Sequence, residues 1–192
     1  SPMIAEPLRL FDFCLETDGA NALVVTTTER ARDLRHPPAV IRAVAQGVSR
    51  GGQGGAMWPV LVREDALQMA SRQVAQRLYE RAGLGPDDVD VAQFYDCFTI
   101  TALLQFEDYG FCGRGEGGPF AESGAIDLGG RLPINTSGGH LSEGYIHGMN
   151  HIVEGVRQIR GTSTSQVPGA EVSLVTSAPP IAASALLLTT DR

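Results

Sequence analysis

The segment at residues 135–151, NTSGGHLSEGYIHGMNH, gathers side chains that can move protons or bind metal ions. It holds three of the four histidines of the chain and one of its four tyrosines. The Ser-Gly-Gly near its start permits tight backbone conformations, and Ser142 is a residue type that often begins a helix. These residue types allow three interpretations: a metal site, an acid/base site, or an ordinary start of a helix.

The histidines of this segment have a spacing that a metal site could use. His140, His147 and His151 follow the pattern H-x6-H-x3-H, and Glu143 could supply a fourth ligand to a divalent ion. However, His140 precedes the expected helix, so nothing in the sequence fixes it near the other two. Helical geometry also rotates His147 and His151 to roughly the opposite face from Tyr145. We therefore expect no metal site, and histidines that are exposed or serve in packing.

Two tyrosines are candidates for acid/base chemistry. Tyr145 falls in the expected first turn of a helix, in register with Met149 and Ile152, so its ring should face the core. A helix dipole stabilises a phenolate there, whereas burial favours the neutral phenol, which is a good donor to an oxyanion. Tyr95 stands in the motif YDCF at the end of an expected strand, where ligands of α/β proteins usually bind. The alternative for either residue is a core tyrosine with a satisfied hydroxyl.

The elements that must position these residues alternate between strand and helix patterns. Apolar runs typical of strands stand at 22–26, 41–46, 89–95, 172–178 and 181–190, the last two joined by a Pro-Pro turn. Helical patterns stand at 65–82, from residue 98, and from about residue 142. Gly83 is the expected C-cap of the first helix, and glycine-rich loops are expected at 49–59 and 110–131. This order predicts an α/β layered fold, a mixed five-stranded sheet with helices on both faces.

Composition argues against several classes of function. A net charge of −7 and a pI near 5.0 disfavour nucleic acid and anionic membranes as partners. No apolar run approaches the roughly 20 residues that cross a bilayer, and no signal peptide is visible, so we expect a cytoplasmic protein. Three cysteines without a CxxC pair favour reduced, buried thiols over disulfides or a zinc knot. All fifteen basic residues are arginines, so this chain offers no lysine for Schiff-base chemistry.

Three motifs in order, DGANALVVTT, GLGPDDVDVAQFYDCF and LPINTSGGHLSEGYIHG, resemble the C-terminal half of the thiolase superfamily. The similarity covers nearly the whole chain and is greatest for the sterol-carrier-protein thiolases and lipid-transfer proteins. In that branch the second motif reads HDCF and the third NPSGGxxSKGHPxG, so Tyr95 and Tyr145 each stand where the family has a histidine. Ser177 and Pro179 stand where many thiolases have a cysteine. These departures disfavour an acyl-CoA thiolase reaction.

Paired tyrosines at these two positions resemble the steroid side-chain-cleaving aldolases of bacteria. The resemblance implies a carbon–carbon lyase that cleaves a 17-hydroxy steroid C22-CoA thioester, by a retro-aldol reaction, to a 17-ketosteroid and propionyl-CoA. In this hypothesis Tyr145 exchanges the proton and Tyr95 supports it by hydrogen bonding, although the roles could be reversed. Asp96 and His140 are further candidates for orienting groups or relaying protons. Residues expected to shape the substrate pocket, or to form a tight turn alone, are Asn135, Ser137, Gly138 and Gly139.

The resemblance also implies how the chain is organised and what it meets. Residues 1–34 would be the end of an N-terminal thiolase-like half and residues 35–192 the C-terminal thiolase-like domain, within a protein about twice as long. We expect a homodimer and a small zinc-ribbon/OB-fold partner protein, with no cofactor, because CoA is part of the substrate. The alternatives are a non-catalytic subunit that binds acyl-CoA or lipid, and a subunit that only scaffolds its partner.

Overall fold

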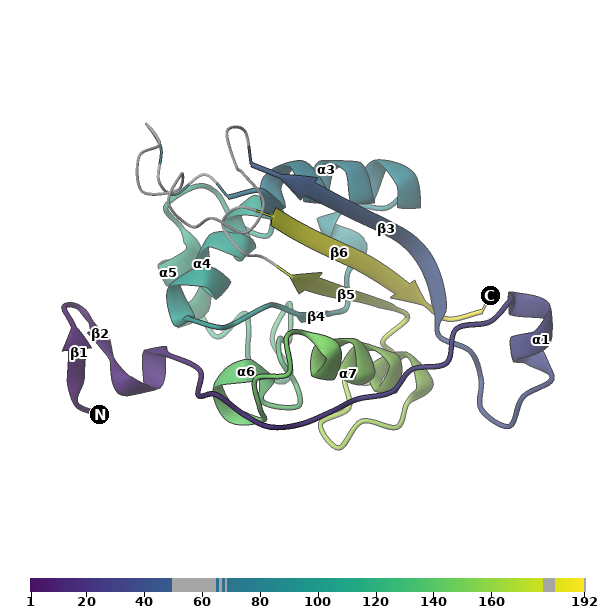
Figure 1. Ribbon diagram of the computed structural model, residues 1–192. Helices are drawn as coiled ribbons and strands as arrows, with labels where there is room; N and C mark the ends of the chain where they lie inside the picture. Colours follow the sequence, from purple (N-terminus) through teal and green to yellow (C-terminus); the bar gives the residue numbers. More distant parts are fainter. Residues whose placement is uncertain (50–64, 66, 68, 178–181, 192) are drawn as a thin grey trace.

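A four-stranded sheet forms the centre of the structure, a computed structural model that describes residues 1–49, 65, 67, 69–177 and 182–191 (Figure 1). Its strand order is β3-β6-β5-β4. The strands are β3 (Val40–Val48), β4 (Val91–Gln93), β5 (Val172–Ser177) and β6 (Ala182–Thr189). Strand β6 is antiparallel to both β3 and β5, whereas β4 runs parallel to β5, so the sheet is mixed.

Helices cover both faces of this sheet (Figure 1). Helix α3 (Ser71–Ala82) packs on β3 and β6, and α7 (Met149–Arg160) packs on β4, β5 and β6 from the other side. Among the described residues, no helix combines the length and apolar character needed to cross a bilayer. The smaller elements are the hairpin β1 (Met3–Ala5) and β2 (Leu8–Arg9), α1 (Thr28–Arg32), α4 (Thr99–Asp108), α5 (Gly117–Glu122), α6 (Gly139–Ser142), and two 3₁₀ turns, Leu10–Asp12 and Pro86–Asp88.

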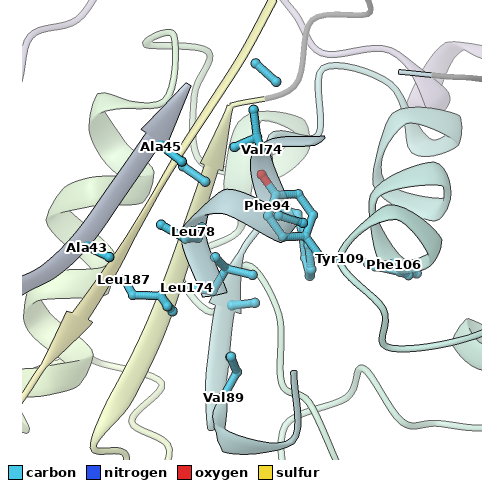
Figure 2. Close-up of a cluster of buried hydrophobic side chains, with 14 of the residues drawn as sticks. Ala43, Ala45, Val74, Leu78, Val89, Phe94, Phe106, Tyr109, Leu174 and Leu187 are labelled. Carbon is cyan, nitrogen blue, oxygen red and sulfur yellow. The ribbon is translucent and has the colours of Figure 1, made fainter. Parts of the chain in front are cut away.

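The larger apolar core lies between the sheet and α3 (Figure 2). Val74 and Leu78 of α3 are fully buried against Leu174 of β5 and Leu187 of β6. Phe94, just beyond β4, extends this core through edge-on contacts with the rings of α4 and its C-terminal end. Because successive strand side chains point to opposite faces, the residues next to these leucines face α7 instead.

Helix α7 presents a largely polar surface to the protein interior. The Glu154 carboxylate is buried, and its Oε1 accepts hydrogen bonds from Thr136 Oγ1 at 2.6 Å, Ser163 Oγ at 2.6 Å and Gln158 Nε2 at 3.0 Å. A buried carboxylate is tolerable only when its oxygens find such donors. This network ties the loop before α6 to α7, and so fixes the segment that holds the clustered histidines and Tyr145.

The structure confirms the mixed α/β layered fold but corrects the number of strands. Among the described residues the central sheet has four strands rather than five, because residues 22–26 form no strand. The Val24 side chain is 91% exposed, so this apolar run is not a buried strand here. The two strands expected at 172–178 and 181–190 are confirmed as β5 and β6, and they pair antiparallel. The Pro-Pro turn between them, Pro179 included, and most of the expected loop at 49–59 lie outside the described residues.

The expected helices are present with altered bounds. Helix α3 begins at Ser71 rather than at residue 65, and Gly83 ends it at φ 66°, the left-handed conformation that glycine favours. Helix α4 follows β4 as expected, and α5 interrupts the predicted loop at 110–131. The single helix expected from about residue 142 is wrong: α6 ends at Ser142, and α7 begins at Met149.

Candidate active site

Tyr95 and Tyr145 meet at the carboxyl ends of β4 and β5. Their hydroxyl oxygens lie 2.9 Å apart, within hydrogen-bond distance. The backbone of Tyr95 is held at both ends: its N–H donates to Thr176 Oγ1 at 3.1 Å, and its carbonyl accepts from Gln105 Nε2 at 2.8 Å. The Tyr95 side chain is buried, whereas Tyr145 is half-buried. The two predicted candidates therefore form one hydroxyl pair.

Asn135 brings the segment of Tyr145 to the end of β4. Its side-chain Oδ1 accepts from the N–H of Phe94 at 2.7 Å, and its Nδ2 donates to the carbonyl of the same residue at 3.1 Å. Asn135 itself has φ 44°, a left-handed conformation that asparagine tolerates better than most residues. The following turn needs glycine, because a Cβ at Gly139, where φ is 63°, would collide with the Asp96 carboxylate.

Asp96, the residue after Tyr95, contacts two buried histidines, His140 and His151. Its Oδ1 accepts from the N–H of His140 at 2.8 Å, and lies 3.6 Å from Nδ1 of that histidine and 3.3 Å from His151 Nε2. The two imidazoles stack with centroids 4.2 Å apart. Burial raises the pKa of the Asp96 carboxyl, but hydrogen bonding from His151 and the His140 N–H outweighs this, so its pKa lies below the ordinary value.

The His140 ring packs against both tyrosine rings and is uncharged. Its ring meets Tyr95 edge-on at 4.4 Å and Tyr145 at 5.0 Å between centroids. Burial, reinforced by the neighbouring His151, lowers the pKa of His140 to about 4. The Nε2 atom accepts from the N–H of Gly148 at 3.0 Å, which leaves the proton of the neutral ring on Nδ1, facing Asp96.

Donor types alone would allow Asp96, His140 and His151 to hold a metal ion, since one ligand atom of each lies within 4.8 Å of the others. The ring geometry is less favourable. An imidazole holds an ion near its ring plane, and two stacked rings inclined by 23° direct their nitrogens side by side rather than at one point. The arrangement suits a hydrogen-bonded cluster better than a metal centre. The absence of a metal stays a prediction. The reason given for it from the sequence, that His151 points away from the core and from His140, is wrong, because His151 is buried and stacks on His140.

Two further predictions about this segment need correction. Tyr145 lies between α6 and α7 rather than in the first turn of a helix, so the expected position in a helical first turn is wrong. His147 was expected on the face away from Tyr145, yet its ring lies 4.5 Å from the Tyr145 ring. The backbone causes both differences: φ is 47° at His147 and 84° at Gly148, which breaks the helix before Met149.

The predicted pocket residues do not all reach the tyrosines. Asn135, Gly138 and Gly139 form the turn that supports the site, with Gly138 at φ 112°. The Ser137 hydroxyl donates instead to Glu143 Oε2 at 2.7 Å. Next to His147, a cavity of about 490 Å³ is lined by this residue, Gly148, Thr176 and Ser177 together with residues of β3 and β6. His147 beside the tyrosines was not predicted from the sequence, in which Gly148 is the available signal of a break in the helix.

The fold and this strand-end site are those of a thiolase-like domain. The family model for the thiolase C-terminal domain-like family matches residues 52–189, and the chain belongs to this family. Sterol carrier protein 2 of Rattus norvegicus is 34% identical over 171 residues, covering 87% of this chain and 31% of that protein. These findings confirm the expected thiolase superfamily membership and its sterol-carrier-protein branch.

Two relatives with high sequence identity to this chain are named as steroid enzymes. It is 51% identical to the 17-hydroxy-3-oxo-4-pregnene-20-carboxyl-CoA lyase of Mycobacterium tuberculosis, over 98% of this chain and 48% of that protein. It is 47% identical to the steroid side-chain-cleaving aldolase of Thermomonospora curvata, over 100% of this chain and 49% of that protein. A solved structure of the Ltp2-ChsH2(DUF35) aldolase superposes with a TM-score of 0.94 at 46% identity, covering 100% of this chain and 50% of that one. The chain thus spans about half the length of these relatives.

Proposed function

We propose that this chain contributes the acid/base site of a retro-aldolase that cleaves a 17-hydroxy steroid C22-CoA thioester to a 17-ketosteroid and propionyl-CoA. The observation that carries the proposal is the hydroxyl pair of Tyr95 and Tyr145, 2.9 Å apart, at two positions where the thiolase motifs have histidine. The similarity to a steroid-CoA lyase and a steroid side-chain-cleaving aldolase at 51% and 47% identity supports the choice of substrate.

The reaction requires two things of the site: proton transfer and stabilisation of an enolate. When the 17-hydroxyl loses its proton, the C17–C20 bond breaks, the ketone forms at C17, and the electron pair passes into the thioester enolate. A proton then adds at C20 to give propionyl-CoA. In our proposal Tyr145, the more accessible phenol, exchanges the proton with the substrate hydroxyl, and Tyr95 stabilises it through the shared hydrogen bond. The scheme involves no acyl-enzyme and no lysine.

Asp96 and His140 serve this pair as positioning residues. Asp96 fixes the backbone of the turn by accepting from the N–H of His140, and the neutral His140 ring packs under both phenols. A charged imidazole there would be buried and would lie beside His151, and burial, reinforced by His151, lowers the pKa of His140 for this reason. Both residues can therefore hold the phenols in place without taking the substrate proton.

The assembly and surroundings of the enzyme belong to the same proposal. A homodimer through the thiolase-like fold and a small zinc-ribbon/OB-fold partner are expected, and the relative whose name joins Ltp2 to ChsH2(DUF35) supports the partner. CoA enters as part of the substrate, and no further cofactor is proposed. The cytoplasmic location expected from composition also stays part of the proposal.

The test is product formation by the full-length polypeptide that contains this chain, assayed with and without a DUF35-type partner. Incubation with 17-hydroxy-3-oxo-4-pregnene-20-carboxyl-CoA should release a 17-ketosteroid and propionyl-CoA in equal amounts, measured by liquid chromatography and mass spectrometry. The matched 17-deoxy thioester should release neither, because it has no hydroxyl to deprotonate. Tight binding of both thioesters without any product would overturn the proposal and favour a non-catalytic binder of acyl-CoA.

A further inference from the structure

His147 stands in a strained position beside the two phenols. Its Nδ1 lies 3.5 Å from the Tyr95 hydroxyl oxygen, and its ring is tilted over the Tyr145 ring at 4.5 Å. A backbone with φ 47° places it there, in the left-handed region that residues other than glycine seldom adopt. Unlike the other two histidines of the segment, His147 is exposed, on the wall of the cavity of about 490 Å³.

Two neutral phenols cannot by themselves keep a proton taken from a substrate. Each carries one hydrogen, so a third proton needs an acceptor at the far end of the pair. Burial raises the pKa of Tyr95 well above that of an ordinary phenol, and the hydrogen bond to Tyr145 raises it further, so the pair does not start as a phenolate. If Tyr145 donates to Tyr95, the Tyr95 hydrogen must point to another acceptor.

Two other candidate acceptors near the pair, His140 and Asp96, already accept hydrogen bonds. His140 Nε2 accepts from the N–H of Gly148, and burial makes its ring a poor base, with a pKa of about 4. The Asp96 oxygens accept from the N–H groups of His140 and Leu141. The Nδ1 of His147 faces the Tyr95 hydroxyl and belongs to an imidazole that meets the cavity, where Arg81 of α3 is the charged side chain among the lining residues.

We infer that His147 is the proton acceptor behind the two tyrosines, an inference that rests on the proposed retro-aldol function. The substrate 17-hydroxyl gives its proton to the Tyr145 oxygen, Tyr145 gives its own to Tyr95, and Tyr95 gives its own to His147 Nδ1. The electron pair of the C17–C20 bond enters the enolate as C17 becomes a ketone. The proton held on His147 then returns through the same oxygens to C20, or exchanges with water in the cavity. The 3.5 Å distance should shorten in the substrate complex, as such contacts often do.

Two variants in the full-length enzyme separate proton acceptance from shape. His147→Gly suits the left-handed backbone and leaves space for a small base, so it should fold normally while turnover falls about 100-fold or more. Added imidazole should restore at least about tenfold of the lost rate in a saturable manner. Pyrazole, a ring of the same shape and a far weaker base, should not. His147→Asn keeps an acceptor and tolerates the backbone but cannot store a proton, so its turnover should fall by a similar factor.

Control reactions use the fourth histidine, His36, which is exposed and outside the site. Neither the wild type nor His36→Gly should respond to imidazole. Three results would each overturn the inference: full turnover by His147→Asn, equal rescue of His147→Gly by pyrazole, or a folded His147→Gly that imidazole does not rescue. In each case, turnover by the wild type would leave the proposed function intact. A wild type that releases no 17-ketosteroid would overturn the proposed function, and this inference with it.

Discussion

Replacing Gly155 by alanine should weaken the packing of α7 on the sheet and disturb the site at its start. A Cβ at this position would lie 2.7 Å from Val175 Cγ2, 3.2 Å from Leu188 Cδ1 and 3.2 Å from Ser173 Oγ. These atoms belong to β5 and β6, which cannot both move away without separating from their neighbours in the sheet. The glycine therefore lets the helix approach the strands closely.

The size of the effect follows from two opposing contributions. Alanine favours a helix over glycine by about 1 kcal/mol, whereas overpacking a well-filled interior costs about 1–3 kcal/mol. Gly155→Ala should therefore lower the free energy of unfolding by up to about 2 kcal/mol. Gly118→Ala in α5 is the matched control, because its Cβ would meet no heavy atom within 4 Å. It should raise the free energy of unfolding by up to about 1 kcal/mol.

Chemical denaturation of both full-length variants beside the wild type measures this difference. Because α7 begins one residue after Gly148 and carries His151 in its first turn, Gly155→Ala should also reduce turnover, whereas Gly118→Ala should not. If both substitutions raised the free energy of unfolding equally, this would refute the claim that α7 packs so closely on the sheet that position 155 has no room for a Cβ.

Two further predictions concern the supports of the site. Because burial lowers the pKa of His140 to about 4, the unfolded chain binds more protons than the folded one from about pH 6.5 down to 4, and stability should fall across that range by at most about 3 kcal/mol. Urea midpoints measured against pH should show this slope in the wild type and a shallower one in His140→Gln; parallel slopes would contradict it. Asn135→Ala should lower the free energy of unfolding by about 2–4 kcal/mol, because it removes both hydrogen bonds to Phe94 and leaves alanine at φ 44°. Asn135→Gly should cost less, and an equal cost for both would show that the backbone conformation contributes nothing.

Local patterns predicted most of the elements that carry the site. The apolar spacing of α3 and the glycine after it were sufficient to place that helix and its end, and β5 and β6 followed from two apolar runs. Tyr95 and Tyr145 were found as departures from a motif, and the structure brings their hydroxyls together. In these cases the decisive residues are neighbours in sequence, or stand at positions that a family pattern aligns.

The missed features depend on contacts between distant segments or on single backbone angles. The apolar spacing of α7 continues back to Tyr145 and predicts a continuous helix. Gly148 is the one signal of the break before α7, and the left-handed angle at His147 has no signal of its own. Asp96 and His151 meet although 55 positions separate them, because β4 ends where α7 begins. The strand expected at 22–26 shows that an apolar run is not enough, since a strand also needs a neighbour to pair with.

The central claim is that the phenol of Tyr145 exchanges the substrate proton, and Tyr145→Phe in the full-length enzyme tests it most directly. This variant removes one hydroxyl oxygen and keeps the ring that packs on His140. Tyr79→Phe is the control, since its hydroxyl donates to the carbonyl of Tyr109 at 3.1 Å, outside the site. With 17-hydroxy-3-oxo-4-pregnene-20-carboxyl-CoA, we predict that Tyr145→Phe lowers kcat about 100-fold or more, while Tyr79→Phe turns over like the wild type. Unchanged release of 17-ketosteroid by folded Tyr145→Phe would contradict the account.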